Sequence, residues 1–347
     1  MDRVLVFAYF NKNVGDDLFV RRLQSNLRDK EITFLVTSGT DTQQLKEVFK
    51  CNIEVYSKVK EKIDTILYSR LGYMYFLKKI VNSYDKIIII GGSMFIEYDG
   101  WERKYRFYKE IINNKTDIIG INFGPYHTTN FLHRYEELFS RSNVVSFRDM
   151  NSYCLFKKLK NKQCKPDIVF GIYEDKDITK KNILGISVID VTTKKNIDYE
   201  KYLRILDKYI QDFSNMGYSI RIFSFCEKEG DLRVCKILKE KYDFLNIVSY
   251  DGYNLDEFIK KYKECKYVVA TRFHAMILGW VFLSKVLPIA YSYKTINVIS
   301  DISDGIKYID LQNTNISDAT PTSTEFSKLR KEKILELSVK SNEHFGK

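Results

Sequence analysis

Short runs of uninterrupted hydrophobic residues recur along the first half of the chain, and segments with helical spacing lie between them. Runs of Val and Ile without polar alternation are typical of strands buried on both faces of a parallel sheet. Helical segments between such strands indicate right-handed βαβ crossovers. The expected elements are strands at Val4–Phe10, Ile32–Thr37, Ile53–Tyr56, Ile87–Ile90, Ile118–Phe123 and Val144–Phe147, with a helix near Asp17–Arg28.

The same alternation returns after a polar stretch, Tyr173–Asn182. The chain is therefore predicted to be an α/β protein with two Rossmann-like domains joined by a charged linker. In such sheets, ligands bind beyond the carboxyl ends of the strands. The elements expected in the second half are strands at Ile183–Ile189, Tyr218–Phe225, Asn246–Ser249, Tyr267–Ala270 and Val286–Ala290, and helices at Tyr199–Met216, Asp231–Lys241, Leu255–Glu264 and His274–Leu283.

These patterns predict a division into four parts. Residues 1–172 form an N-terminal Rossmann-like domain, 173–182 a linker, 183–310 a C-terminal Rossmann-like domain, and 311–347 a helical tail docked by one apolar stripe. Lys60–Val81 is basic and rich in aromatic residues. It is either a helix that packs on the sheet or a helix that lies on a membrane surface.

Composition narrows the classes of partner. The chain has 347 residues, a formal net charge of +11, and 25 Tyr and 23 Phe, which indicate a large folded core. Lys and Arg are spread through both halves and mixed with acidic residues, so we expect no nucleic-acid partner. No signal peptide and no stretch of 18 apolar residues is found. We therefore expect a cytoplasmic protein, with peripheral contact at the inner face of the membrane as a further expectation.

Candidate ligand-binding residues follow several predicted strands. After the first strand, Asn13, Gly15, Asp16 and Asp17 form a turn before a helix, where free N–H groups favour an anion or a polar ligand. The alternative is a helix cap formed by one aspartate. Glycines that follow later predicted strands allow a ligand or a neighbouring backbone to come close to the edge of the sheet. The further candidates at these turns are Gly91, Gly92, Ser93 and Gly124.

Candidate cations follow three of the later strands. Ser146 and Arg148 stand at the end of one strand, and the alternative for Arg148 is an ion pair with Asp149. Arg272 and His274 stand between a strand and an apolar helix, where an anion meets both the guanidinium and the helix start. Lys294 follows the next strand and adds a third cation, unless it is simply solvated.

Several chemistries are not supported by the sequence. Walker A, HExxH and Cys/His clusters with zinc spacing are absent. Asp175 and Asp177 match a D-x-D pattern but lie in the polar linker rather than at a strand end. We therefore expect neither a metal nor a cofactor.

Taken together and in order, these motifs resemble the polysaccharide pyruvyl transferase family. The resemblance covers roughly residues 1–300. The R-x-H segment followed by a lysine after the next strand is its most specific part. The matching residues are Asn13, Gly15 and Asp16; Gly91 and Gly92; Gly124 and Pro125; Ser146, Arg148, Asp149 and Ser152; Pro166 and Asp167; and Arg272 with His274.

The resemblance implies a GT-B type fold, with two domains that face each other across a cleft, and transfer of a pyruvyl group from phosphoenolpyruvate onto two hydroxyls of a sugar. The product is a cyclic ketal on a cell-surface glycan or its lipid-linked precursor. The resemblance also implies that Arg148, Arg272, His274 and Lys294 serve phosphoenolpyruvate, and that the C-terminal domain holds this donor. His274 is expected to act as an acid, and Asp16 or Asp17 to hold or deprotonate the acceptor from the opposite domain.

One position departs from the family pattern, because Asp190 stands where a basic residue is expected. Two alternatives remain open: a GT-B type glycosyltransferase that uses a nucleotide sugar, and a sugar-binding or scaffold protein. Consumption of phosphoenolpyruvate distinguishes a pyruvyl transferase from both of these alternatives. We also expect alanine at Arg272 or His274 to abolish turnover with little change in thermal stability.

Overall fold

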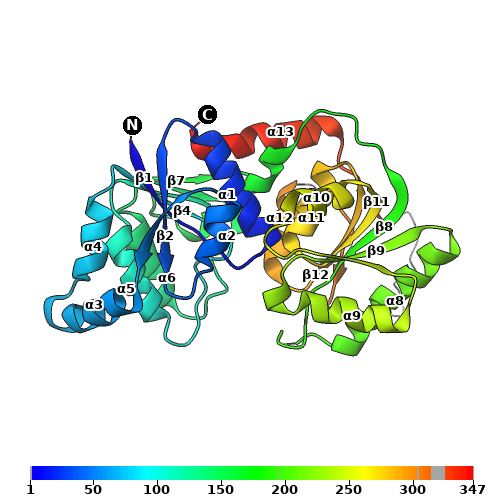
Figure 1. The fold of residues 1–347 in the computed structure, drawn as a ribbon, viewed down its shortest axis with the longest axis horizontal. Coiled ribbons are helices and arrows are strands. Elements are labelled where there is room, and N and C mark those ends of the chain that lie inside the picture. Colours follow the sequence, from blue (N-terminus) through cyan, green and yellow to red (C-terminus); the bar gives the residue numbers. More distant parts are fainter. Residues whose placement is uncertain (1, 195, 303–304, 314–324, 347) are drawn as a thin grey trace. The chain divides into compact units, whose positions relative to one another are not determined.

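The protein divides into two compact units in the computed structural model, which describes residues 2–194, 196–302, 305–313 and 325–346 (Figure 1). The first unit comprises residues 1–10, 18–168 and 340–347. The second comprises residues 11–17 and 169–339. Each unit is built on its own parallel sheet, as the hydrophobic runs predict.

The first unit contains a seven-stranded sheet in the order β3-β2-β1-β4-β5-β6-β7. Val4 of β1 pairs with Ile32 of β2 on one side and Lys86 of β4 on the other. The order therefore reverses between β1 and β4. The elements are β1 (Arg3–Phe7), α1 (Val14–Asn26), β2 (Glu31–Thr37), α2 (Thr42–Glu47), β3 (Asn52–Tyr56), α3 (Lys58–Leu71), α4 (Tyr75–Asn82), β4 (Lys86–Ile90), α5 (Trp101–Ile111), β5 (Thr116–Ile121), α6 (Thr129–Phe139), β6 (Val144–Phe147), α7 (Met150–Leu155) and β7 (Lys162–Cys164).

The second unit contains a six-stranded sheet in the order β10-β9-β8-β11-β12-β13, so its order reverses between β8 and β11. α11 is buried along almost its whole length and directly follows β11. The elements are β8 (Lys181–Ser187), α8 (Tyr199–Asn215), β9 (Ser219–Ser224), α9 (Asp231–Lys241), β10 (Asn246–Ser249), α10 (Leu255–Lys263), β11 (Cys265–Ala270), α11 (Phe273–Val281), β12 (Lys285–Ala290), α12 (Tyr293–Ile302), β13 (Ile309–Asp310) and α13 (Lys331–Asn342), with 3-10 turns at Ile168–Ile172, Glu227–Glu229 and Glu343–Phe345.

Aromatic residues form much of the core of the first unit. Phe95 contacts Tyr108, Tyr135 and Phe139 with ring centroids 4.8, 5.3 and 4.9 Å apart. All four rings are buried, and the tilted and edge-on arrangements suit their quadrupoles. The first unit therefore fills the space between its sheet and its covering helices with large, rigid side chains.

The division differs from the predicted domains at three places. Residues 11–17 and 169–172, predicted within the N-terminal domain, belong to the second unit. Residues 340–347, at the end of the predicted tail, pack with the first unit. The tail buries Ile334 and Leu337 of α13 and leaves Leu335 and Val339 exposed, and residues 314–324 of the predicted tail lie outside the described residues.

The basic segment Lys60–Val81 forms two helices rather than one. α3 ends at Gly72, whose φ of 77° is left-handed and whose N–H bonds to the carbonyl oxygen of Tyr68. A glycine in this conformation ends a helix because it carries no Cβ penalty. The strands β7 and β13 were not predicted, since three and two residues are too short to show a pattern. Within the described part of the chain, no helix is both long and apolar enough to cross a bilayer.

Candidate active site

The point where the strand order reverses in the second unit lies beside the predicted site residues Arg272 and His274. Ser187 ends β8, and its hydroxyl oxygen accepts hydrogen bonds from the backbone N–H groups of Thr271 (3.1 Å) and Arg272 (3.2 Å). These residues lie between β11 and α11. Parallel sheets bind ligands at such reversals, beyond the carboxyl ends of the strands. Arg272 and His274 thus occupy the edge at which the sequence predicted a site.

Arg272 is buried and held by two carboxylates. Its Nε donates to Asp231 at 2.9 Å, its Nη2 bonds to the second oxygen of the same carboxylate, and its Nη1 lies 2.5 Å from Glu229. Asp231 is fully buried and also accepts from the backbone N–H groups of Phe225 and Cys226 at 3.0 Å each. The guanidinium is therefore a fixed part of the sheet edge.

Arg272 and Glu229 each favour the ionised state of the other. Burial opposes the charge of Arg272, but the Asp231 carboxylate more than offsets it and raises the pKa of the guanidinium. Burial also raises the pKa of Glu229, and the nearby Arg272 overcomes this effect and lowers that pKa below its usual value. Glu229 is half exposed, so the ion-pair network of Arg272, Asp231 and Glu229 is in contact with solvent at Glu229.

Lys294 joins the same group of charges. Its ammonium lies 5.5 Å from the centre of the Tyr291 ring, and that of Lys194 lies 5.8 Å from the same ring. Burial raises the pKa of Tyr291, but the charges of Lys294 and Arg272 together lower it. Three cations therefore converge on one phenol near the carboxyl ends of β11 and β12.

His274 lies against the first turn of α1. A Cβ placed on Gly15 would fall 1.7 Å from Nδ1 of His274, so only glycine fits there. The N–H of Gly15 donates to Oδ1 of Asn13 at 3.0 Å, which fixes the turn. Asn13, rather than an aspartate, therefore provides the side-chain hydrogen bond at this helix start. The N-x-G-D and R-x-H motifs meet within the second unit.

Asp16 and Asp17 have different environments. Asp17 is fully buried, and its carboxylate accepts a hydrogen bond from the hydroxyl of Tyr250. Asp16 is partly exposed. Both belong to the second unit, so the expectation that they act from the domain opposite His274 is wrong. Of the two, Asp16 has the access that a ligand requires.

The candidate residues of the first unit form a separate network. Nη1 of Arg148 donates to Asp167 at 2.9 Å, and its Nη2 donates to Oδ1 of Asn122 at 2.6 Å. Ser93 donates to the same Asn122 oxygen at 3.0 Å. A Cβ on Gly92 would lie 2.6 Å from Nη1 of Arg148, so the guanidinium covers this glycine. Arg148 is thus buried with Asp167 as its salt-bridge partner, in place of the Asp149 pair considered from the sequence.

Ser146 contacts the C-terminal tail. Its hydroxyl lies 2.8 Å from Nδ1 of His344, whose Nε2 lies 2.8 Å from the carbonyl oxygen of Pro166. Because a carbonyl can only accept, Nε2 carries the proton and Nδ1 accepts from Ser146. Burial lowers the pKa of His344 to about 4, although the Pro166 contact opposes this effect. The imidazole is therefore neutral and links the tail to β6.

Asp149 and Ser152 complete the S-x-R-D-x-x-S motif with local structural contacts. The Asp149 carboxylate accepts from the N–H of Ser152 at 2.7 Å and caps α7. The Ser152 hydroxyl oxygen accepts from the N–H of Phe123 at 2.9 Å, next to Gly124. Gly124 has a φ of 95°, and its N–H bonds to the carbonyl oxygen of Phe95 at 2.8 Å. These contacts fix the loops beyond β5 and β6.

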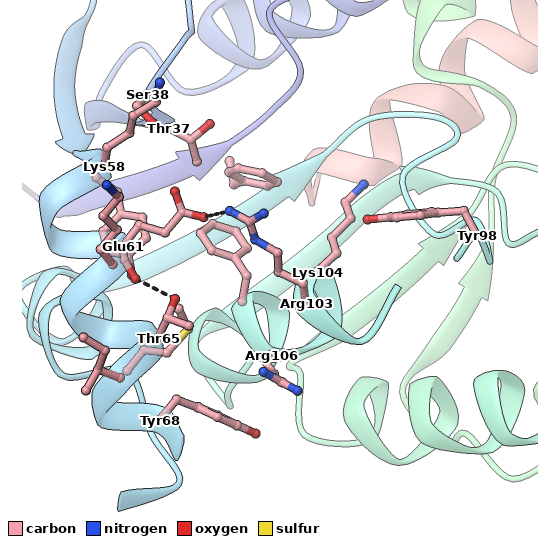
Figure 2. A pocket seen from close by; sticks show the side chains of 16 residues that line it. Thr37, Ser38, Lys58, Glu61, Thr65, Tyr68, Tyr98, Arg103, Lys104 and Arg106 are labelled. Carbon is pink, nitrogen blue, oxygen red and sulfur yellow. Dashed lines mark hydrogen bonds and ion pairs between the residues drawn. The ribbon is translucent and has the colours of Figure 1, made fainter. Parts of the chain in front are cut away.

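A pocket of about 960 Å³ opens in the first unit where β1, β2 and β3 end (Figure 2). Helices α3 and α5 supply its other walls. A Cβ on Gly91 would lie 2.6 Å from Sδ of Met94, and the Met94 carbonyl oxygen accepts from Lys104, a pocket residue, at 2.9 Å. The loop of the predicted Gly91–Ser93 motif is thus tied to the wall of this pocket.

Sequence reasoning missed five residues that shape these sites. Asp231 begins a helix and resembles an ordinary cap in sequence, and Lys104 is one of several cations on an amphipathic helix. Because their importance depends on partners far along the chain, no local pattern marks them. The five are Lys104, Lys194, Glu229, Asp231 and Tyr291.

Among the described residues, no group of three His, Cys, Asp or Glu side chains is arranged to hold a metal ion. Asp175 and Asp177 are exposed, and Lys331 lies 3.5 and 3.9 Å from them. Asp190, the departure from the family pattern, pairs with Arg233 at 2.5 Å. Burial raises the pKa of Asp190, while Thr192 and Arg233 lower it more, so the carboxylate is ionised and its charge is matched.

Residues 13–293 match the family model for polysaccharide pyruvyl transferases, and Lys294 directly follows this range. No curated protein matches the sequence. The fold is similar to HepE of Anabaena in complex with UDP and glucose, with a TM-score of 0.56 and 10% identity over 100% of this chain and 95% of that chain. It is also similar to UDP-GlcNAc 2-epimerase from Methanocaldococcus jannaschii, with a TM-score of 0.55 and 8% identity over 97% and 91%. These likenesses concern the fold alone and confirm the predicted GT-B-like α/β class.

Proposed function

Because the chain belongs to the polysaccharide pyruvyl transferase family, we propose that it transfers the pyruvyl group of phosphoenolpyruvate onto two hydroxyls of a sugar. The observation that carries this proposal is the group of cations around Tyr291 in the second unit. Arg272, which lies two residues before His274 at the start of α11, acts on this phenol together with Lys194 and Lys294. A phosphate and a carboxylate on one small donor need such a set of fixed positive charges.

The reaction follows from this arrangement. Protonated His274 gives a proton to C3 of the donor, which makes C2 electrophilic. One sugar hydroxyl attacks C2 and loses its proton, which gives a tetrahedral adduct that still carries the phosphate. The second hydroxyl then displaces phosphate and closes the ketal ring, and its proton passes to a base. Lys194 and Lys294 stabilise the charge on the leaving phosphate, and Asp16 accepts a hydroxyl proton.

Arg272 has a different role from the two lysines in this proposal. Its three donor nitrogens already bind Asp231 and Glu229. It therefore acts as a positioning residue that fixes the loop before α11, and its charge contributes to the field at Tyr291. In this proposal phosphoenolpyruvate binds mainly to Lys294 and Lys194, which are only partly buried.

The test is incubation of the protein with phosphoenolpyruvate and a panel of acceptors: methyl glycosides, sugar 1-phosphates and short-chain lipid-linked sugars. We expect phosphate release that depends on one acceptor class, with the ketal detected by mass spectrometry. A parallel panel replaces phosphoenolpyruvate with UDP-sugars. Consumption of a UDP-sugar without phosphate release from phosphoenolpyruvate would favour a glycosyltransferase, and no turnover in either panel would favour a binding or scaffold protein.

We further propose peripheral contact of the first unit with an anionic membrane through α3. Val59, Ile63 and Ile66 are exposed at spacings of four and three residues, and form an apolar stripe on that helix. Lys62 and Arg70 are exposed beside or at the end of the stripe. A basic helix with an exposed apolar stripe binds at the boundary between headgroups and acyl chains.

Sedimentation with vesicles tests this contact. We expect the protein to bind phosphatidylglycerol vesicles and to bind phosphatidylcholine vesicles weakly, because the lysines and arginines attract anionic headgroups. Replacement of both Val59 and Ile63 with Ser should reduce binding at least fivefold. The matched control is Leu335→Ser, which changes an equally exposed apolar residue of α13. Equal effects of the two changes would contradict a role for α3.

A further inference from the structure

The pocket of the first unit combines aromatic surfaces with positive charge (Figure 2). Phe7, Tyr56, Tyr68, Tyr98 and Phe107 present rings to it. Sugar rings bind well on such surfaces because their C–H faces are apolar while their hydroxyls remain available for hydrogen bonds. The volume of about 960 Å³ exceeds the space that one sugar ring fills, so the pocket suits a short glycan or a substituted sugar.

The side chains that line this pocket carry more positive than negative charge. Among the described lining residues, Glu61 is the one carboxylate, and it is bound to Arg103 at 2.6 Å. Figure 2 shows this ion pair, which joins α3 to α5. The remaining lining cations are Lys58, Lys62, Lys104 and Arg106. The pocket therefore has an excess of positive charge next to its aromatic surfaces.

Lys104 is the most unusual of these cations. Its ammonium donates to the carbonyl oxygen of Met94 at 2.9 Å and to the hydroxyl of Tyr9, and it lies 4.9 Å from the centre of the Tyr9 ring. The ion pairs among the described residues do not include it. Burial lowers the pKa of Lys104 to about 8. A desolvated ammonium with only neutral partners is stabilised when an anion binds beside it.

We propose that this pocket binds the sugar acceptor, and that the acceptor carries an anionic group that pairs with Lys104. The inference rests on the proposed function for the identification of the bound sugar as the acceptor. The anionic group has two chemical sources, a phosphate on the sugar or a carboxylate of a uronic acid. Lys104 recognises the charge, and the aromatic residues hold the sugar ring.

Calorimetric titration without phosphoenolpyruvate tests the pocket directly. The probes are N-acetylglucosamine 1-phosphate, methyl glucuronide, neutral methyl N-acetylglucosaminide and inorganic phosphate. We expect one charged sugar to bind at least tenfold more tightly than the neutral sugar and than phosphate alone. The preferred probe identifies the source of the charge. Equal binding of charged and neutral sugars would overturn the proposal.

Variants at position 104 assign the effect to one side chain. Lys104→Met should lower the affinity for the charged sugar at least tenfold and leave the neutral sugar unchanged. The matched control is Lys79→Met, which removes an exposed lysine of α4 outside the pocket. Lys104→Arg keeps the charge and should retain binding, which separates loss of recognition from a failure to fold. Full affinity in a folded Lys104→Met variant would refute the role of Lys104.

The pH dependence gives an independent readout. Since only the ammonium form attracts the anion, the affinity of the wild type should fall as the pH rises from 7 to 9, through the lowered pKa of Lys104. Lys104→Arg and Lys104→Met should lack this fall. The other titratable groups facing Lys104 are the phenols of Tyr9, Tyr98 and Tyr108, with Glu61, Arg103 and the remaining lysines further along the wall, and all of them are kept in both variants.

Activity then separates this proposal from the proposed function. If the protein turns over phosphoenolpyruvate, Lys104→Met should raise the KM of the charged acceptor and leave kcat and the KM of phosphoenolpyruvate nearly unchanged. Binding that depends on Lys104 without any turnover would contradict the proposed function but support an anionic-sugar site. Turnover with an unchanged acceptor KM in Lys104→Met would contradict the acceptor site and leave the proposed function intact.

Discussion

Replacement of Arg272 with Ala is expected to abolish turnover and to lower the free energy of unfolding by about 3–5 kcal/mol. The reason is Asp231, which is fully buried and forms its ion pair with Arg272, while the nearby Glu229 carries the same negative charge. Breaking a buried pair by removing one member leaves the other charge uncompensated. The sequence had suggested little change in stability, and the buried ion pair corrects that expectation for this residue.

Urea denaturation and phosphate release measure the two effects of Arg272→Ala separately. Arg272→Lys keeps the charge but loses the planar fork that binds both oxygens of Asp231, so we expect an intermediate loss of stability. The double variant Arg272→Met with Asp231→Asn removes both charges and keeps an acceptor oxygen for the N–H groups of Phe225 and Cys226. It should recover most of the stability but no activity. A single Ala variant as stable as the wild type would show that the pair does not exist in solution.

The parallel sheets could be predicted from sequence because their buried strands are continuous apolar runs. The runs at Ile87–Ile90 and Val144–Phe147 correspond closely to β4 and β6. The run predicted at Ile118–Phe123 begins and ends two residues later than β5, because Thr116 and Asp117 are polar and Phe123 is apolar. Strand ends are set by hydrogen bonds to neighbouring strands, and these are not visible in hydrophobicity alone.

The candidate site was predictable only in part, for a physical reason. Residues at strand ends could be located, because the carboxyl ends of parallel strands share one edge. The partners of their side chains could not, because they come from distant segments. Arg148 pairs with Asp167 and Ser146 contacts His344, across 19 and 198 residues. These contacts give the S-x-R-D-x-x-S motif a structural role. The contact between Arg148 and phosphoenolpyruvate, which the family resemblance implies, stays a prediction.

The close approach of Gly15 to His274 leads to the second large effect. Gly15→Ala should lower kcat/KM at least a hundredfold, because the new Cβ would lie 1.7 Å from Nδ1 of His274 and must displace the ring. A displacement of about 1 Å at a catalytic group costs about this much. The backbone of Gly15 has an ordinary φ, so alanine introduces a steric conflict rather than backbone strain. Overpacking of this kind also lowers stability by about 1–3 kcal/mol.

A double-mutant cycle identifies the cause of that loss. In a His274→Ala background the ring is gone and the space beside Gly15 is open, so Gly15→Ala should have little further effect on either turnover or the free energy of unfolding. The two single changes should therefore be strongly non-additive. If Gly15→Ala lowers stability equally in both backgrounds, the glycine is required by something other than the imidazole. If the cycle is non-additive as expected, the first βα turn of the chain controls the position of the proposed acid, which explains why N-x-G-D and R-x-H occur together in one sequence.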